Sequence, residues 1–388
     1  MPSMKSRPAI ALLALLNACA VPDPQSATPF ELDAVPSLSI GVEASDTSDA
    51  YELSRIYDAH RLPDGRILVP NSDPPELRLF DATGKHLRTI GRTGAGPNEF
   101  GEFSTLQVFT SGDRLIAPDV GAMRVHLYDK DLSFLETRRF ALSAAVSRPF
   151  LRGIFADGTW LVLAYEGGGR IGGPPGSVIE SRFSLLRYDT SGALLDSLGT
   201  FDGAKRFAHE FNGFIQFPYI PLSNSPIQGV AGNSLVVLRG DKPELEYYDL
   251  AGNLARIASW QRERVRSAEI IDAYKMADLA TIPAADTRRR LTDEDYYKRD
   301  LPIPEYAPLY QALLVDAGQR VWLERFRLPR DTSDRLWDVI SPQGTWLGVV
   351  RTPPRLTLYR IGSDHVLGRS LDSLGVERVE LYGLRVRR

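Results

Sequence analysis

The sequence contains a single cysteine, Cys19, among 388 residues, which excludes an intramolecular disulfide. It has only five histidines, and none of them stands at the spacing of a paired metal ligand. No segment supplies the roughly 18 consecutive apolar residues of a membrane-spanning helix. The 46 basic residues nearly balance the 49 acidic ones, so the chain lacks the basic excess expected of a nucleic-acid-binding protein. Nucleophile-elbow, phosphate-loop and zinc-protease motifs are also absent.

The N-terminal segment accounts for the lone cysteine. Lys5 and Arg7 precede an apolar run over residues 9–16, which is too short to span a bilayer and is typical of a secretory signal. The sequence Leu16-Asn17-Ala18-Cys19 follows it. It resembles the lipobox of bacterial lipoprotein signal peptides; Leu16 and Ala18 match that pattern, whereas Asn17 departs from it. An ordinary cleaved signal with a chance cysteine is the alternative.

The lipobox resemblance implies a division of the chain. Residues 1–18 would be removed as a signal peptide, Cys19 would be lipidated, and residues 19–30, rich in proline, serine and threonine, would form a tether. Acyl chains contribute about 0.8 kcal/mol per buried methylene, so the mature protein would be held on a membrane surface. Ala20 after the cysteine resembles the sorting signal of Gram-negative lipoproteins for the outer membrane. We therefore expect a lipid-anchored protein of the cell envelope, at the outer membrane or the periplasmic face.

A recurring unit fills residues 31–388. In its first copy an Asp/Gly turn at 63–66 precedes a buried strand at 67–69, an alternating strand at 77–80, a second Asp/Gly turn at 81–84 and a return strand at 86–90. Later copies begin near residues 111, 156, 231, 316 and 356, and the last is degenerate.

Six small sheets, each too small to stand alone, favour radial packing into a six-bladed β-propeller over a linear solenoid. The last copy lacks a strand, and a strand predicted at 38–42 would complete its sheet and close the ring. The predicted fold class is therefore all-β, with one closed domain.

The junction between the first two copies carries a sharper motif, formed by Gly94, Gly96, Pro97, Glu99 and Phe100. It resembles the inter-blade signature of NHL repeats, and Asp119 and Arg124 match the Asp and Arg that follow in that family. The chain as a whole resembles bacterial 6-bladed β-propeller lipoproteins with NHL-like or TolB-like blades. The resemblance implies a fold and assigns no catalytic residue.

One segment, at about 262–300, interrupts the β pattern between the fourth and fifth copies. Ser267 is a candidate cap for a helix that ends before Pro283, and a second short helix is expected near Thr292. The insertion either decorates one mouth of the channel or serves as a lid or docking surface. Arg288, Arg289 and Arg290 lie near Asp286, Asp293, Glu294 and Asp295, which indicates a solvated, internally compensated face.

The loop at 166–178 satisfies the spacing of a dinucleotide-binding motif at Gly167, Gly169 and Gly172. No helix follows and no βαβ unit surrounds it, so we expect a mobile loop at the propeller rim and assign no cofactor.

Two classes of function remain open. The first is a monomeric binding or scaffold module for a protein or carbohydrate, for which exposed aromatic residues are candidates, although burial between blades is the more common state of such residues. They are Phe211, Phe214, Phe217, Tyr219, Tyr306 and Tyr310. The alternative is a calcium-dependent, lactonase-like hydrolase with its metal in the channel. Its candidate ligands, at the ends of predicted inner strands, are Asn71, Asp119, Glu166, Asn212 and Glu324. We assign no catalytic role or metal site to any of them.

Overall fold

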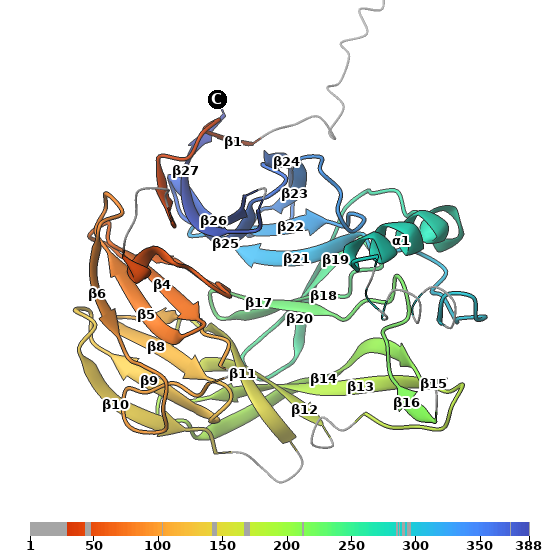
Figure 1. Ribbon diagram of the computed structural model, residues 1–388, viewed down its shortest axis with the longest axis horizontal. Coiled ribbons are helices and arrows are strands. Elements are labelled where there is room, and N and C mark those ends of the chain that lie inside the picture. Colours follow the sequence, from red (N-terminus) through yellow and green to blue (C-terminus); the bar gives the residue numbers. More distant parts are fainter. Residues whose placement is uncertain are drawn as a thin grey trace, which may run out of the picture.

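A computed structural model describes residues 29–42, 48–102, 104–141, 146–166, 171–211, 213–284, 286, 288, 292, 296–372 and 374–387. The predicted signal peptide, Cys19 and residues 20–28 of the predicted tether lie outside these residues. Five four-stranded sheets and one five-stranded sheet are arranged around a central axis (Figure 1). The fold is a six-bladed β-propeller, which confirms the predicted fold class.

The blades follow one another along the chain. The first contains β3 (His60–Arg61), β4 (Ile67–Ser72), β5 (Pro75–Phe80) and β6 (His86–Ile90). The second contains β7 (Phe109–Ser111), β8 (Arg114–Asp119), β9 (Arg124–Tyr128) and β10 (Phe134–Arg139). The third contains β11 (Val146–Ile154), β12 (Trp160–Glu166), β13 (Val178–Tyr188) and β14 (Leu194–Phe207).

The fourth blade contains β17 (Ile227–Ala231), β18 (Ser234–Leu238), β19 (Glu244–Tyr248) and β20 (Leu254–Ser259). The fifth contains β21 (Tyr310–Val315), β22 (Val321–Arg325), β23 (Arg335–Ile340) and β24 (Trp346–Thr352). The sixth contains β25 (Thr357–Ile361), β26 (His365–Leu371) and β27 (Glu377–Val386).

The N-terminal segment closes the ring, as predicted. Strands β1 (Phe30–Leu32) and β2 (Leu38–Ile40) both pair antiparallel with β27, so the sixth sheet is built from both ends of the chain. The ring of Phe30 is buried with its centroid 5.5 Å from that of Trp322 in the fifth blade. The edge that β27 would otherwise expose is thereby covered.

The repeated Asp/Gly turns hold the third and fourth strands of the blades together. In the third blade the Oδ1 atom of Asp189 accepts hydrogen bonds from the backbone N–H groups of Ser191 (2.8 Å) and Ala193 (3.0 Å). Gly192 has a φ of 87°, which a residue with a Cβ rarely adopts. The carboxylate therefore satisfies the backbone donors of a turn whose conformation the glycine permits.

The core lies between neighbouring blades rather than inside any one sheet. One cluster joins the first two blades through Leu68, Leu79, Phe100, Leu115 and Tyr128, all of which are almost completely buried. Burial of such a side chain contributes about 1.5–3 kcal/mol, so each blade depends on its neighbours for stability.

Helix α1 (Ser267–Thr281) lies between β20 and β21. That place is between the fourth and fifth blades counted from His60, or between the fifth and sixth if the sheet that contains β1 and β2 is counted first. Ser267 is the first helical residue and Arg266 occupies the cap position without a side-chain hydrogen bond, so the prediction of Ser267 as the cap was wrong by one residue. The side chain of Ser267 is buried instead, and its hydroxyl has no hydrogen-bond partner among the described residues. Most residues of the second predicted helix, with Arg289, Arg290, Asp293, Glu294 and Asp295, lie outside the described residues.

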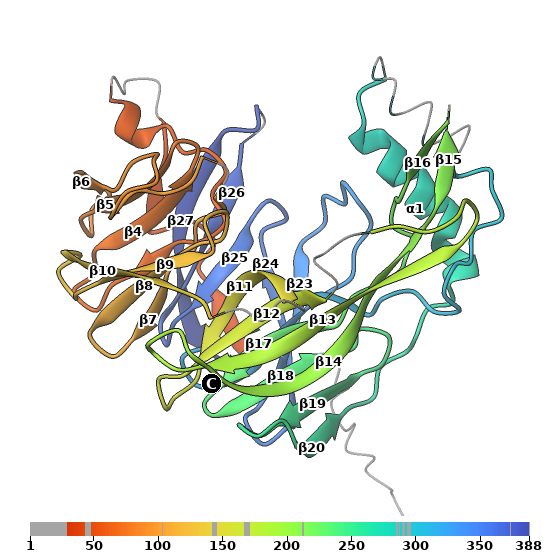
Figure 2. The same cartoon turned by 90° about the horizontal axis from the view of Figure 1, so that it is seen from below.

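The third blade extends beyond the others. Strands β13 and β14 have 11 and 14 residues, whereas the third and fourth strands of the other four-stranded blades have five to seven. A hairpin of β15 (His209–Phe211) and β16 (Phe214–Gln216) follows, and Figure 2 shows it beside α1, projecting from one side of the ring. The hydroxyl of Tyr296 donates to the carbonyl oxygen of Tyr219 (2.8 Å), and Leu279 of α1 packs in one cluster with Phe207. We call the ends of β13 and β14, the β15–β16 hairpin and α1 the lobe.

Candidate functional site

Each blade carries a carboxylate–guanidinium pair where a loop joins its two middle strands. In five blades the nitrogen and oxygen atoms lie 2.6–3.0 Å apart, and the carboxylate side chain is at most 17% exposed. These pairs are Arg78–Glu76, Arg124–Asp119, Arg239–Glu246, Arg335–Glu324 and Arg369–Glu377. In the third blade Arg182 and Glu166 are 3.7 Å apart, with side chains 58% and 34% exposed. The recurring pair is therefore closed in five blades and open in the third.

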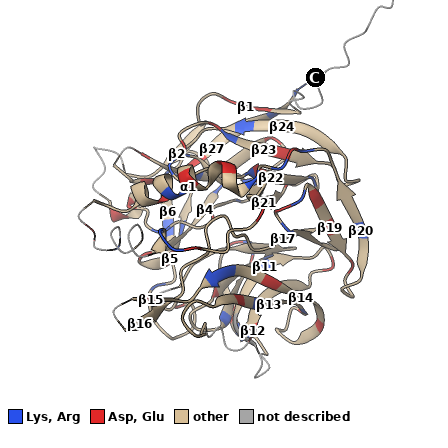
Figure 3. Ribbon diagram, turned by 90° about the vertical axis from the view of Figure 1, so that its right-hand side faces the viewer, with Lys and Arg blue, Asp and Glu red and all other residues tan. Residues whose placement is uncertain are grey.

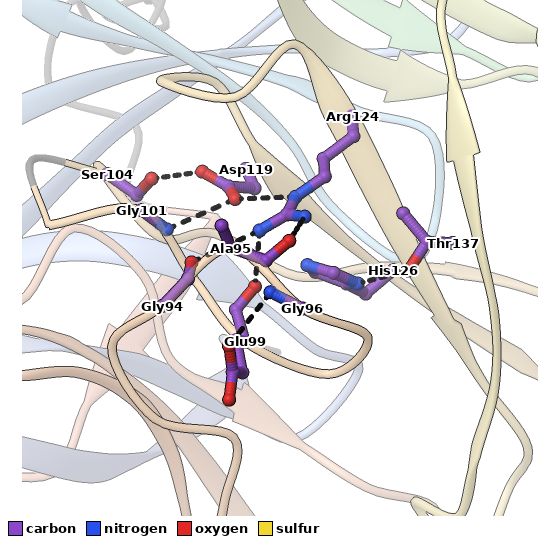
Figure 4. A network of polar contacts seen from close by, with 10 residues as sticks. All are labelled: Gly94, Ala95, Gly96, Glu99, Gly101, Ser104, Asp119, Arg124, His126 and Thr137. Atoms are coloured by element: carbon purple, nitrogen blue, oxygen red, sulfur yellow. Dashed lines mark hydrogen bonds and ion pairs between the residues drawn. The ribbon is translucent and has the colours of Figure 1, made fainter.

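The pair in the second blade is the most enclosed (Figure 4). Asp119 receives hydrogen bonds from Arg124 Nε (3.0 Å), the backbone N–H of Gly101 (3.1 Å) and the hydroxyl of Ser104. The guanidinium of Arg124 also donates to the carbonyl oxygens of Gly94 (3.3 Å), Ala95 (2.7 Å) and Glu99 (2.8 Å). The residues of the NHL-like motif thus fix the crossover from β6 to β7, which is a structural role.

Among the described residues, the candidate calcium ligands Asn71, Asp119 and Glu324 each bind a different partner. Asn71 accepts a hydrogen bond from the backbone N–H of Ser54 (2.8 Å) and donates one to the carbonyl oxygen of Pro74 (2.9 Å). Asp119 and Glu324 bind arginines of their own blades, and Asn212 lies outside the described residues. Among the residues that the structure describes, no three His, Cys, Asp or Glu side chains gather as a metal site would require.

The open pair of the third blade lines a cleft. The cleft has a volume of about 620 Å³ and lies between the inner strands of the third and fourth blades and the lobe. Aromatic and charged side chains share its lining. They include Phe150, Tyr165, Phe183, Tyr219, Arg152, Glu166, Glu180, Arg182 and Arg206. Ligand sites in proteins commonly combine such a volume with aromatic walls and a few polar groups.

Arg152, on the innermost strand β11, lies where this cleft meets the central channel. Arg152 and Gln228 line both the cleft and the channel cavity of about 380 Å³. Among the described residues, no carboxylate lies within ion-pair distance of Arg152, and its guanidinium carbon is 5.5 Å from the centre of the Phe150 ring. Its side chain is exposed in the cleft, yet the surrounding protein desolvates the guanidinium and lowers its pKa. An anion there would replace the missing solvation.

Glu166, which also lines the cleft, is held loosely. One carboxylate oxygen, Oε1, accepts hydrogen bonds from the hydroxyls of Ser184 (3.1 Å) and Thr200 (3.2 Å). The other oxygen, Oε2, faces Arg182 at 3.7 Å, and Arg182 also lies 3.5 Å from Asp202. A ligand can therefore replace the contact between Arg182 and Glu166 without leaving a buried charge unpaired.

A second cavity of about 710 Å³ lies at the turns of the first, second and sixth blades, and most of its charged groups pair with one another. Arg66 pairs with Asp64 (2.6 Å), Lys130 with Asp131 (2.8 Å), and Arg61 with Asp364 (3.5 Å). Across the side of the molecule that carries α1, basic and acidic residues are likewise interspersed (Figure 3). The cleft of the third blade is thus the better candidate site.

The predicted aromatic residues divide between surface and core. Phe214 is 74% exposed and Tyr219, which lines the cleft, is 56% exposed, so the expectation of burial was wrong for these two. Tyr310 is buried between blades as expected, and Tyr306 lies beneath the guanidinium of Arg264 at 3.6 Å. The hairpin β15–β16 holds Phe214 away from the blades, because it pairs only with itself.

Sequence reasoning missed Arg152. The signal was present in Phe150-Leu151-Arg152-Gly153-Ile154, where an arginine alternates with apolar residues along one strand. That segment was not assigned as the innermost strand of a blade, so its arginine was not placed in the channel.

Comparison with known proteins agrees with the architecture. Residues 40–151 match the model of DUF5128, a family described as a 6-bladed beta-propeller; the match runs from β2 into β11. The chain is a six-bladed β-propeller and is similar to that family over this stretch. No curated protein matches the sequence. Among the described residues, no helix is long and apolar enough to cross a membrane.

Three solved structures are similar to this chain over most of their length. A candidate exported protein of Bacteroides fragilis is 14% identical, with a TM-score of 0.48 over 94% of this chain and 98% of that one. A member of the DUF4221 family from Bacteroides vulgatus is 11% identical, with a TM-score of 0.47 over 94% and 100% of the two chains. A streptogramin B lyase is 11% identical, with a TM-score of 0.41 over 92% and 98%.

Proposed function

We propose that this protein is a binding module of the cell envelope, anchored by a lipid on Cys19, and that its ligand occupies the cleft of the third blade. The observation that carries the proposal is the open pair. Five blades hold a carboxylate that is at most 17% exposed within 3.0 Å of its arginine, whereas the third presents Glu166 and Arg182, with Arg152, to a cleft of about 620 Å³. Binding surfaces commonly lie on the loops and edges of a rigid scaffold.

The lobe supports the same assignment. The extensions of β13 and β14, which the other blades lack, contribute Glu180 and Arg206 to the lining of the cleft, and Tyr219 lines it beside Arg206. A calcium-dependent hydrolase, the alternative from the sequence, has no comparable support, because Asp119 and Glu324 each bind an arginine of their own blade.

The anchor is tested on the protein isolated from membranes. Intact mass should show a mature chain that begins at Cys19 and carries added acyl mass, and Cys19→Ala should leave the membrane fraction. An unmodified Cys19, or cleavage at another residue, would contradict the lipid anchor.

The cleft is tested with a substitution that fills it. Ala204 lines the cleft, whereas Ala251 is an exposed residue in a turn of the fourth blade. Wild-type protein and the variants Ala204→Trp and Ala251→Trp are applied to an array of oligosaccharides and peptides. We expect Ala251→Trp to bind as the wild type does and Ala204→Trp to lose binding. No binding by the wild type, or binding unchanged in Ala204→Trp, would contradict the assignment of the cleft.

A further inference from the structure

We infer that the ligand of the cleft is an acidic saccharide whose carboxylate binds Arg152 at the junction of cleft and channel. The inference rests on the proposed function and names the chemical class of ligand for the same site.

The first argument is the unpaired cation. A guanidinium presents parallel N–H donors that match a carboxylate, and such charge-assisted pairs are stronger than neutral hydrogen bonds. Among the described residues, Arg182 pairs with Glu166 and Asp202, whereas Arg206 has no carboxylate partner but donates to the carbonyl oxygen of Phe217 (2.8 Å). Arg152 is the lining arginine that has neither an ion-pair nor a hydrogen-bond partner among these residues. Because Arg152 also lines the channel, the ligand's anionic group would lie at the deep end of the cleft.

The second argument concerns the two glutamates. Glu166 and Glu180 both line the cleft, and an ionised carboxylate can only accept hydrogen bonds. A ligand that offered negative charge alone would be repelled by them. Hydroxyl groups donate to carboxylates. A ligand that combines one carboxylate with several hydroxyls can therefore bind both Arg152 and the two glutamates. Gln228, which can donate and accept, lies between these groups and the channel.

The third argument is the aromatic wall. Tyr165 and Tyr219 line the cleft, and the guanidinium carbon of Arg206 lies 3.7 Å from the centre of the Tyr219 ring, which holds that ring in place. Ring faces carry partial negative charge and contact C–H groups favourably. A sugar ring has such an apolar face, whereas inorganic phosphate has none.

The test is calorimetric titration of the full chain with matched probes: trigalacturonate, the neutral galactotriose of the same linkage, inorganic phosphate and an aspartate-rich peptide. The variants are Arg152→Gln and Arg152→Lys, with Arg355→Gln as a control, because Arg355 is exposed and lines neither cleft nor channel. A thermal melt of each variant establishes that it is folded.

We expect trigalacturonate to bind at least about 10-fold more tightly than galactotriose, since a charge-assisted hydrogen bond contributes about 1.5–3 kcal/mol. Arg152→Gln should abolish this preference and leave the weak binding of galactotriose unchanged. Arg152→Lys should restore part of the preference, and Arg355→Gln should bind like the wild type.

Other outcomes separate the two proposals. Equal binding of both saccharides, or a preference that persists in Arg152→Gln, overturns the acidic class; if Ala204→Trp still removes that binding, the cleft remains the site. Binding of the peptide or of phosphate alone overturns the saccharide class. Absence of binding to every probe here and to the whole array overturns both the inference and the proposed function.

Discussion

The second and third blades differ in how they hold the same pair of charges. In the second blade Asp119 is completely buried and is satisfied by Arg124, Gly101 and Ser104. In the third blade Glu166 is 34% exposed, and its arginine stands 3.7 Å away. A closed pair cannot be broken without leaving a buried charge, whereas an open pair can rearrange around a ligand. The repeat therefore serves stability in one blade and is available for recognition in the other.

The largest expected effect comes from two matched arginine substitutions. Arg124→Gln leaves Asp119 buried without its cation, so we expect the free energy of unfolding to fall by about 3–5 kcal/mol. Arg152→Gln removes a cation that has no carboxylate partner among the described residues, so we expect a change within about 0.5 kcal/mol. Urea denaturation monitored by tryptophan fluorescence measures both, and a similar loss in the two variants would remove the distinction between closed and open sites.

A second expected effect is the dependence of stability on pH at His60, on the innermost strand β3 of the first blade. Burial, and then the charges of Arg360 and His365, lower the pKa of His60 from its ordinary 6.5 to about 3. In the unfolded chain His60 binds a proton near pH 6.5, whereas in the folded chain it stays neutral until the pH falls to about 3. The stability that neutral His60 contributes is therefore complete above about pH 6.5 and is lost as the pH falls toward 3, at up to about 1.4 kcal/mol per pH unit.

His60→Gln removes the titrating ring and should flatten the dependence of unfolding free energy on pH between about 6.5 and 4.5. His86→Gln, the same substitution at a histidine on the outer strand β6, serves as the matched control. Denaturation series at three pH values measure the slopes. An identical slope in wild type and His60→Gln would show that His60 is not held neutral by the fold.

A smaller contrast distinguishes two glycines of the third blade with almost the same backbone angle. Gly192 (φ 87°) lies in a closed turn, where an added Cβ would stand 2.7 Å from the carbonyl oxygen of Arg139. Gly176 (φ 82°) lies in the loop before β13, and nothing stands within 4 Å of its Cβ position. Alanine at Gly176 should cost about 1 kcal/mol for backbone strain alone, and alanine at Gly192 about 2–3 kcal/mol. Thermal denaturation compares them; equal losses would mean that the clash is relieved.

Much of the fold follows from local chemistry that a sequence displays. Asp189 and Gly192 signal a turn because the carboxylate bonds its own backbone and the glycine permits a positive φ, and the same pattern recurs in other blades. The strand that closes the ring could be predicted because the last copy was one strand short. Asp119 and Arg124 were recognised from the NHL-like motif, although their role is structural.

The site depended on contacts that no local pattern encodes. Arg152 reaches the channel only because β11 is the innermost strand of its blade. Tyr219, which lines the cleft, accepts a hydrogen bond from Tyr296, 77 residues later in the sequence. The carboxylates considered as ligands of one metal lie at the ends of equivalent strands in separate blades. Each therefore pairs with an arginine of its own blade. The spacing of residues along the chain predicts the turns and strands. Which charged side chains remain unpaired and free to bind a ligand depends on how the blades pack around the ring.

The comparison between closed and open pairs is tested most directly by two double-mutant cycles, Asp119→Ala with Arg124→Ala and Glu166→Ala with Arg182→Ala, each measured by urea denaturation. We predict a coupling energy above about 2 kcal/mol in the second blade, where the pair is buried, and below about 0.5 kcal/mol in the third, where it is exposed. Equal coupling in the two blades would contradict the account, because the third blade would then be as closed as the second.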